Sequence, residues 1–269
     1  MLADYHMHLE KDSVTEDCRF APDRVMEYAA AAAAAGLAEI GISEHCHRFR
    51  QFRPIMSSLL EPQLVAGGWW LPDQFNYDLD GYVAAVLTAA GREAPVAIRL
   101  GLEVDYIPGR EDDIRALLAG YPWDYVIGSV HFLPGWAIDV SPQDGWPHRD
   151  VDQAYRDYFQ FLMEAAATGL FDIMAHPDLI KKFGHRPSFD LTPLYREAAE
   201  VFARAGVTAE LSTAGWHVPV GEAYPAPQFL EILAGAGVPI SLGSDAHDPA
   251  HVGRDFRRAV QLARRCGYR

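Results

Sequence analysis

The chain has 269 residues, of which 49% are hydrophobic and 22% are charged, and its formal net charge is −14 at pH 7. This length suits one large α/β domain, and the balance of residue types is ordinary for a soluble globular enzyme. The acidic balance argues against a general nucleic-acid surface, which would need a basic stripe, although bound divalent cations would offset part of the negative charge.

Cysteine usage and the start of the chain suggest where the protein works. Cys18, Cys46 and Cys266 form no C-x-x-C pair and indicate no disulfide framework, which favours a reducing cytoplasm. The N-terminus has no basic region followed by an apolar core, so we expect no signal peptide. The alanine run at 29–35 is too short to span a bilayer. We therefore expect a cytoplasmic protein with no membrane partner; its oligomeric state stays open.

Strands and helices alternate along the chain. Apolar runs predict strands at 2–6, 38–43, 96–102, 125–130, 171–175, 207–211 and 238–242. Helical patterns, several closed by glycine, predict helices at 22–36, 77–90, 110–119, 151–168, 191–205, 227–236 and 252–266. Such alternation is typical of parallel βαβ units, and the number of units favours a closed (β/α) barrel over an open sheet. No linker or composition shift interrupts it, so we assign residues 1–269 to one domain.

Residues 48–76 form the one long stretch without clear periodicity. It contains Arg48, Arg50 and Arg53, followed by Trp69 and Trp70 beside paired glycines. A long loop inserted in a compact domain is commonly a lid or a binding loop. A surface insertion that covers apolar barrel helices explains it equally well, so both interpretations stay open.

Residues able to bind a metal ion follow almost every predicted strand. His6 and His8 lie at i and i+2 on an extended segment, so their side chains point the same way, and the pair Asp245 and His247 repeats this spacing after the last strand. In a barrel the carboxyl ends of the strands meet at one mouth. A single histidine there is more often a capping or core-edge residue, but all strands except the sixth carry such a residue. The full set is His6, His8, His45, Glu103, His131, His176, Asp245 and His247.

The chemistry of this set points to a cluster of ions. It offers nitrogen and oxygen donors without a thiolate, which suits zinc, manganese or iron. The candidates are too many for one ion, so we expect two or three divalent ions close together. Closely spaced ions are a known design for hydrolysing phosphoesters, because they generate a hydroxide nucleophile at neutral pH and clamp the phosphoryl oxygens.

Six ordered motifs resemble those of the polymerase-and-histidinol-phosphatase (PHP) family: D-Y-H-M-H, I-S-E-H, G-L-E-V-D-Y, Y-V-I-G-S-V-H, A-H-P-D-L-I-K-K-F-G and L-G-S-D-A-H. They cover nearly the whole chain and look most like the monofunctional histidinol-phosphatases. The resemblance implies a distorted (β/α)7 barrel with a trinuclear metal centre. It also implies hydrolysis of L-histidinol phosphate to L-histidinol and phosphate in histidine biosynthesis, by attack of a metal-bound hydroxide. The alternatives are a nucleotide, oligonucleotide or phosphotyrosine substrate, or a catalytically silent metal-binding module.

The resemblance also implies how the ligands are shared. His6, His8, Glu103 and Asp245 would hold one ion. Glu103 would bridge to a second ion held with His131 and His176, while His45 and His247 would hold the third. Asp245 and His247 are also our candidates for catalytic residues.

The chain departs from the family pattern after His8, where many members carry a further histidine. The loop here offers the acids Glu10, Asp12, Glu16 and Asp17 instead. We predict that Glu10 completes the third site, because it lies at i+2 from His8 and continues the same strand face. The alternatives are a role for His47, a third ion that is weakly held or absent, or four acids that are solvated loop charges.

Cationic residues near the barrel mouth are candidates for binding a small phosphorylated substrate, because phosphate needs cationic donors. These are Arg48 in the long loop and Lys181, His185 and Arg186 after the fifth strand. A solvated basic loop is the alternative for each of them. Asp105 or Asp139 could bind the ammonium or imidazole of histidinol phosphate.

Overall fold

The computed structural model describes residues 2–10, 20–60 and 65–269. In these residues the large sheet has seven strands in the order β1-β2-β3-β4-β7-β8-β9, and each neighbouring pair is parallel. The strands are β1 (Ala3–Asp4), β2 (Glu39–Ile42), β3 (Ala97–Asp105), β4 (Tyr125–Ser129), β7 (Ile173–Met174), β8 (Thr208–Ser212) and β9 (Ile240–Gly243). A small antiparallel pair, β5 (Phe132–Leu133) and β6 (Trp136–Ala137), follows β4.

The two edges of this sheet meet and close it into a barrel. The backbone N–H of Tyr5, just after β1, donates to Leu242 O of β9 at 3.1 Å, and the N–H of Asp245 donates to His6 O at 2.8 Å. The barrel is distorted, because β1 and β7 contain only two residues each. The distorted (β/α)7 barrel predicted from the sequence is confirmed.

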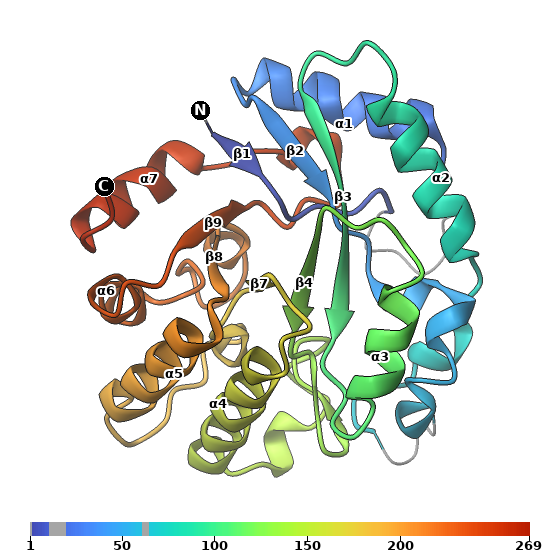
Figure 1. The fold of residues 1–269 in the computed structure, drawn as a ribbon. Helices are drawn as coiled ribbons and strands as arrows, with labels where there is room; N and C mark the ends of the chain where they lie inside the picture. Colours follow the sequence, from blue (N-terminus) through green and yellow to red (C-terminus); the bar gives the residue numbers. More distant parts are fainter. Residues whose placement is uncertain (1, 11–19, 61–64) are drawn as a thin grey trace.

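Helices lie around the outside of the strands and follow them in alternation (Figure 1). Local signals set several of their ends: Asp150 caps α4 by accepting a bond from Gln153 N, and Gly206 ends α5 with a φ of 73° that suits glycine. No helix among the described residues is long and apolar enough to cross a membrane. The helices are α1 (Pro22–Ala34), α2 (Leu79–Ala90), α3 (Glu111–Leu118), α4 (Val151–Ala167), α5 (Thr192–Ala205), α6 (Pro227–Gly235) and α7 (Phe256–Arg265).

A tyrosine packs between the first strands of the barrel. The hydroxyl of Tyr125 on β4 donates to Tyr5 O at 2.7 Å. A Cβ added at Gly41 on β2 would lie 2.1 Å from the Tyr125 hydroxyl oxygen, and one at Gly101 on β3 would lie 2.3 Å from its ring. Only glycine leaves room for the ring at these two positions. The phenol therefore fills the space between these strands.

The stretch predicted as a long loop, 48–76, packs onto the barrel through its described part. It carries short 3-10 turns, and Phe49, Phe52 and Met56 belong to the hydrophobic core. Ala66 N donates to Gly135 O at 3.0 Å, which joins the stretch to the β5–β6 hairpin. The assignment of the whole chain to one domain stays a prediction.

Candidate metal centre

The carboxyl ends of the barrel strands bring the predicted metal ligands to one place. Three groups of these residues place their ligand atoms within 4.8 Å of one another. The groups consist of His8, His45 and His247; of His6, His8 and Glu103; and of Glu103, His131 and His176. They join β1, β2, β3, β4, β7 and β9, which are far apart in the sequence.

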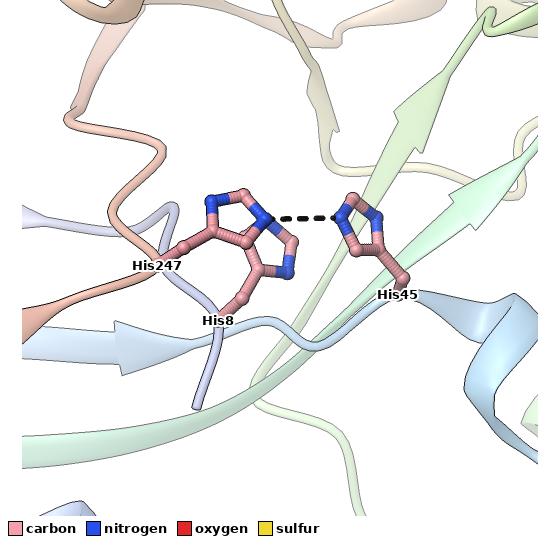
Figure 2. Close-up of side chains that lie close together, drawn as sticks. All are labelled: His8, His45 and His247. Carbon is pink, nitrogen blue, oxygen red and sulfur yellow. Dashed lines mark hydrogen bonds between the residues drawn. The ribbon is translucent and has the colours of Figure 1, made fainter. Parts of the chain in front are cut away.

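The first group is made of histidines alone. The ring of His8 stacks on that of His45 at a centroid distance of 3.9 Å and on that of His247 at 4.4 Å. The Nε2 atoms of His45 and His247 face each other at 3.4 Å (Figure 2). Two imidazole nitrogens in this arrangement can both bind a cation placed between them.

The other two groups share Glu103, which is 1% exposed. Its Oε1 lies 3.5 Å from His6 Nε2, 3.7 Å from His131 Nε2 and 3.3 Å from His176 Nε2. Such a buried carboxylate among imidazoles on both sides has the placement that a bridging ligand requires.

Asp245 completes this part of the centre. Its Oδ1 lies 3.2 Å from His8 Nε2 and 3.6 Å from His6 Nε2. The backbone φ is 53° at Asp245 and 26° at His176. Positive φ values are uncommon outside glycine, and such strain gathers at functional sites.

A carboxylate that the sequence analysis missed stands behind His6. Glu210 on β8 accepts from the Nδ1–H of His6 at 2.7 Å, and its second oxygen accepts from His176 N at 2.6 Å. Gly243 on β9 makes room for it, since a Cβ there would lie 1.8 Å from Glu210 Oε1. The sixth strand of the barrel thus contributes a residue from within the strand, and this residue supports two predicted metal ligands. The signal in the sequence was a glutamate between apolar residues in T-A-E-L-S.

Two more histidines have a carboxylate behind the ring. His131 Nδ1 lies 2.8 Å from Asp105 Oδ1, within hydrogen-bonding distance, whereas His8 Nδ1 and Glu44 Oε1 lie 3.4 Å apart as an ion-pair contact. When a carboxylate accepts the Nδ1–H, the other ring nitrogen keeps its lone pair for a metal ion, and the ring orientation is fixed. Asp105 is committed to His131, which speaks against the alternative that it binds the substrate.

Neighbouring groups shift the pKa values of His8 and Glu103 in the centre. Burial opposes protonation of His8, but Asp245 and Glu44 raise its pKa to about 9. Burial would raise the pKa of Glu103, yet His45 and His6 hold it well below its usual range. Glu103 is therefore a carboxylate and can serve as a ligand.

The donors fit divalent metal ions. They consist of imidazole nitrogens and carboxylate oxygens, as the sequence predicted. His6 Nε2 is buried and has no hydrogen-bond partner in the described structure. A buried lone pair of this kind is expected to have a partner, and a metal ion supplies one.

A cavity of about 340 Å³ opens beside the centre, with His45 and His131 in its lining. Arg48, a predicted phosphate-binding residue, also lines it. The Arg48 guanidinium is buried and pairs with Glu10, with its Nε 2.5 Å from Glu10 Oε2. The long stretch 48–76 therefore supplies part of the cavity wall, as the binding-loop interpretation requires.

Lys181 does not line this cavity, which speaks against its predicted role in binding phosphate. It is 1% exposed, and its ammonium contacts Asp178 Oδ2 at 2.8 Å, Glu222 Oε2 at 2.8 Å and Ala223 O at 2.7 Å. The neighbouring Lys182 lines the cavity instead, with its ammonium 3.2 Å from Asp139 Oδ2.

The structure also places two other predicted substrate residues elsewhere. Arg186 is 46% exposed and pairs with Glu222 at 3.3 Å. The ring of His185 stacks on Trp146 at 4.1 Å. Neither is among the described residues that line the cavity, so neither prediction gains support.

Glu10, our candidate for completing the third site, is not in any of the three groups found among the described residues. Burial raises its pKa to about 7 while the Arg48 charge lowers it. Asp12, Glu16 and Asp17 lie outside the described residues. The alternative candidate, His47, stacks on His45 at 4.8 Å. Which residue completes the third site therefore stays a prediction. The structure places His8 beside His45 and His247 at this site.

Comparison with known proteins gives a consistent result. A family model described as "PHP domain" matches residues 4–214. A "probable histidinol-phosphatase" of Deinococcus radiodurans is 38% identical over 273 residues, covering 100% of this chain and 95% of that protein.

Two solved structures share the fold. That of hisK from Listeria monocytogenes has a TM-score of 0.80 and 23% sequence identity, and the match covers 95% of this chain and 99% of that one. The histidinol phosphate phosphatase of Lactococcus lactis, complexed with zinc, L-histidinol and phosphate, has a TM-score of 0.72 and 21% identity, over 100% of this chain and 94% of that one.

Proposed function

The chain belongs to the PHP domain family, and from this premise we propose that it is a metal-dependent phosphomonoesterase that hydrolyses L-histidinol phosphate to L-histidinol and phosphate in histidine biosynthesis. The observation that carries the proposal is Glu103, a buried carboxylate shared by two groups of histidines at the barrel mouth. The substrate follows from the name of the relative with 38% identity. The ligands in the Lactococcus lactis structure agree with it.

We propose that the centre holds two or three divalent ions, of zinc, manganese or iron. Bound there, such ions supply a nucleophile from water at neutral pH and neutralise phosphoryl oxygens. By their grouping and the family motifs, the residues that would hold them are His6, His8, Glu103 and Asp245 for one ion, Glu103, His131 and His176 for another, and His45 and His247 beside His8 for a third.

The chain's own residues prepare this site. Glu210, Asp105 and Glu44 orient the histidine rings before any substrate arrives. Asp245 differs from Glu103 in being 24% exposed, so its carboxylate can also be reached from the mouth. The charges of His6 and His8 overcome the effect of burial and hold the pKa of Asp245 well below its usual range. We propose that Asp245 orients the attacking water by accepting a hydrogen bond from it. His247 remains our second candidate for a catalytic residue.

Two cations on the cavity wall are suited to the phosphoryl group. Arg48 is held in place by Glu10 and by Gln74, whose side-chain oxygen accepts from Arg48 Nη1. Lys182 takes the position that we expected for Lys181. A guanidinium whose other contacts fix its orientation loses little side-chain entropy when it binds an anion.

The direct test is phosphate release by purified, metal-analysed protein across a panel of substrates. We expect the highest kcat/KM with L-histidinol phosphate, and lower values with a mononucleotide and a phosphotyrosine peptide. A higher value for either of the latter two would replace the proposed substrate. We also propose a cytoplasmic setting, which suits the free thiols of Cys46 and Cys266.

A further inference from the structure

Besides Arg48 Nε, which is ion-paired with Glu10, the residues that line the cavity contain two buried polar atoms without hydrogen-bond partners in the described structure. One is Nδ1 of His47, a residue that is 7% exposed, and the other is Nε1 of Trp70. Both residues line the cavity. Their rings meet edge to face at a centroid distance of 4.8 Å. Because buried polar groups are nearly always paired, two such atoms on one cavity wall point to a ligand.

The chemistry of these atoms limits what that ligand is. An indole Nε1–H only donates, whereas the ring of a histidine offers a donor at one nitrogen and an acceptor at the other. A ligand that pairs with both must present an acceptor and a second polar atom close together. A neutral imidazole ring has this composition, with one N–H donor and one acceptor nitrogen.

The third feature of the wall is the indole of Trp69. It lines the same cavity and is 62% exposed, far more than the other large hydrophobic side chains that the described structure exposes. Indole faces stack on planar rings in offset geometry, and a large exposed aromatic group at a cavity mouth often marks a binding site. Trp69 can therefore cover a flat ring that bonds to the wall.

We propose that His47, Trp69 and Trp70 form a specificity subsite that binds the imidazole ring of the substrate. This proposal rests on the proposed function and deepens it. The subsite adjoins the metal centre, because His47 stacks on His45 at 4.8 Å and His45 lines the same cavity. One small molecule can thus have its phosphate at the centre and its ring against this wall.

The ammonium group of such a substrate has a partner in the same cavity. Asp139 is the one carboxylate among the described residues that line it. Its Oδ2 lies 3.2 Å from the Lys182 ammonium, and its side chain is 22% exposed. A carboxylate and an exposed indole that line one cavity can hold an ammonium through charge and cation–π attraction. Asp139 therefore completes the contacts of the organic end.

The test compares two substrates that differ only in the ring. L-histidinol phosphate is measured against L-leucinol phosphate, which keeps the amino-alcohol phosphate and replaces the imidazole with an alkyl group. Trp70→Phe removes the N–H donor but keeps an aromatic ring. We expect it to lower kcat/KM for L-histidinol phosphate about 10-fold or more relative to the value for L-leucinol phosphate, mainly through KM. Trp69→Leu should shift this ratio in the same direction.

Trp146→Phe is the matched control, because Trp146 Nε1 is also buried without a partner but Trp146 is not among the residues that line the cavity. It should leave the ratio of the two substrates unchanged. Metal content is measured for every variant, so that a loss of ions is separated from a loss of specificity. An equal loss for both substrates, or an unchanged ratio in Trp70→Phe with full metal content, would overturn the subsite.

A second measurement separates this proposal from the function on which it rests. If another phosphomonoester proves to be the better substrate, the proposed function fails, and L-histidinol is then tested as a competitive inhibitor of that reaction. The subsite predicts that Trp70→Phe raises the inhibition constant of L-histidinol about 10-fold or more while Trp146→Phe does not. Equal inhibition of the two variants would contradict the subsite.

Discussion

The metal centre and the cavity wall beside it differ in what lies behind their rings. In the centre, His6, His8 and His131 each have a carboxylate behind the ring. On the wall, His47 and Trp70 each keep a buried nitrogen without a partner in the described structure. The rings of the first region are therefore held before substrate binds, whereas we propose that a ligand completes the second. On this proposal, residues of the first region set the rate and residues of the second set the choice of substrate.

The largest effect should come from removing a ligand of the centre. His131→Ala and His176→Ala should each lower kcat by about 100-fold or more, because losing a ligand misplaces the ions and the attacking water. The exposed histidine substitution His148→Ala is the control and should keep full turnover. Phosphate release under saturating substrate measures this. Near-normal kcat in both ligand variants would remove these two residues from the centre.

A substitution at Glu210 tests whether the carboxylates behind the histidine rings contribute to metal binding. Glu210→Gln keeps the size of the side chain but removes the charge that orients His6 and binds His176 N. We expect metal affinity to fall about 10- to 100-fold, as measured by competition with a chromophoric chelator. Affinity equal to that of the unchanged protein would mean that the negative charge of Glu210 is not needed to orient the ring of His6.

Two adjacent lysines give a direct contrast between structure and binding. Lys181→Met leaves the buried Asp178 without its cation, so it should reduce the free energy of unfolding by about 3 kcal/mol or more. Lys182→Met, in the cavity wall, should instead raise KM with little change in stability. Denaturant unfolding and steady-state kinetics on both variants measure these effects. The reverse pattern would restore our original choice of Lys181 as the substrate residue.

A smaller effect concerns the metal-free protein and pH. Asp245 and Glu44 overcome the effect of burial and raise the pKa of His8 from 6.5 to about 9. Since the folded pKa is the higher one, protonation of His8 stabilises the folded state fully below pH 6.5, and this contribution is lost as pH rises to about 9. Thermal unfolding of chelated protein should show Tm falling across this window. A flat or rising Tm would contradict the charge balance described for the centre.

The barrel and most of the centre follow from the sequence, because parallel strands carry their functional residues at their carboxyl ends. His45, Glu103 and His247 are recognisable in this way. Glu210 is not, because it lies inside a strand, where its two hydrogen bonds depend on neighbours distant in the chain.

The direction of side chains outside the strands also could not be predicted from the sequence. Lys181 ends a 3-10 turn, Leu179–Lys181, that sends its ammonium into the protein, whereas Lys182 faces the cavity. Glu10 does follow His8 closely, but its carboxylate meets Arg48 from the long stretch 48–76. That pairing depends on how the stretch folds back, which periodicity does not reveal.

The central claim is that the clustered histidines and carboxylates hold ions that drive phosphate release. One preparation should be assayed with L-histidinol phosphate as purified, after complete chelation with metal analysis, and after addition of zinc, manganese or iron. The account predicts that activity disappears with the ions and returns when one of these metals is restored. Full activity in protein shown to be free of metal would contradict it.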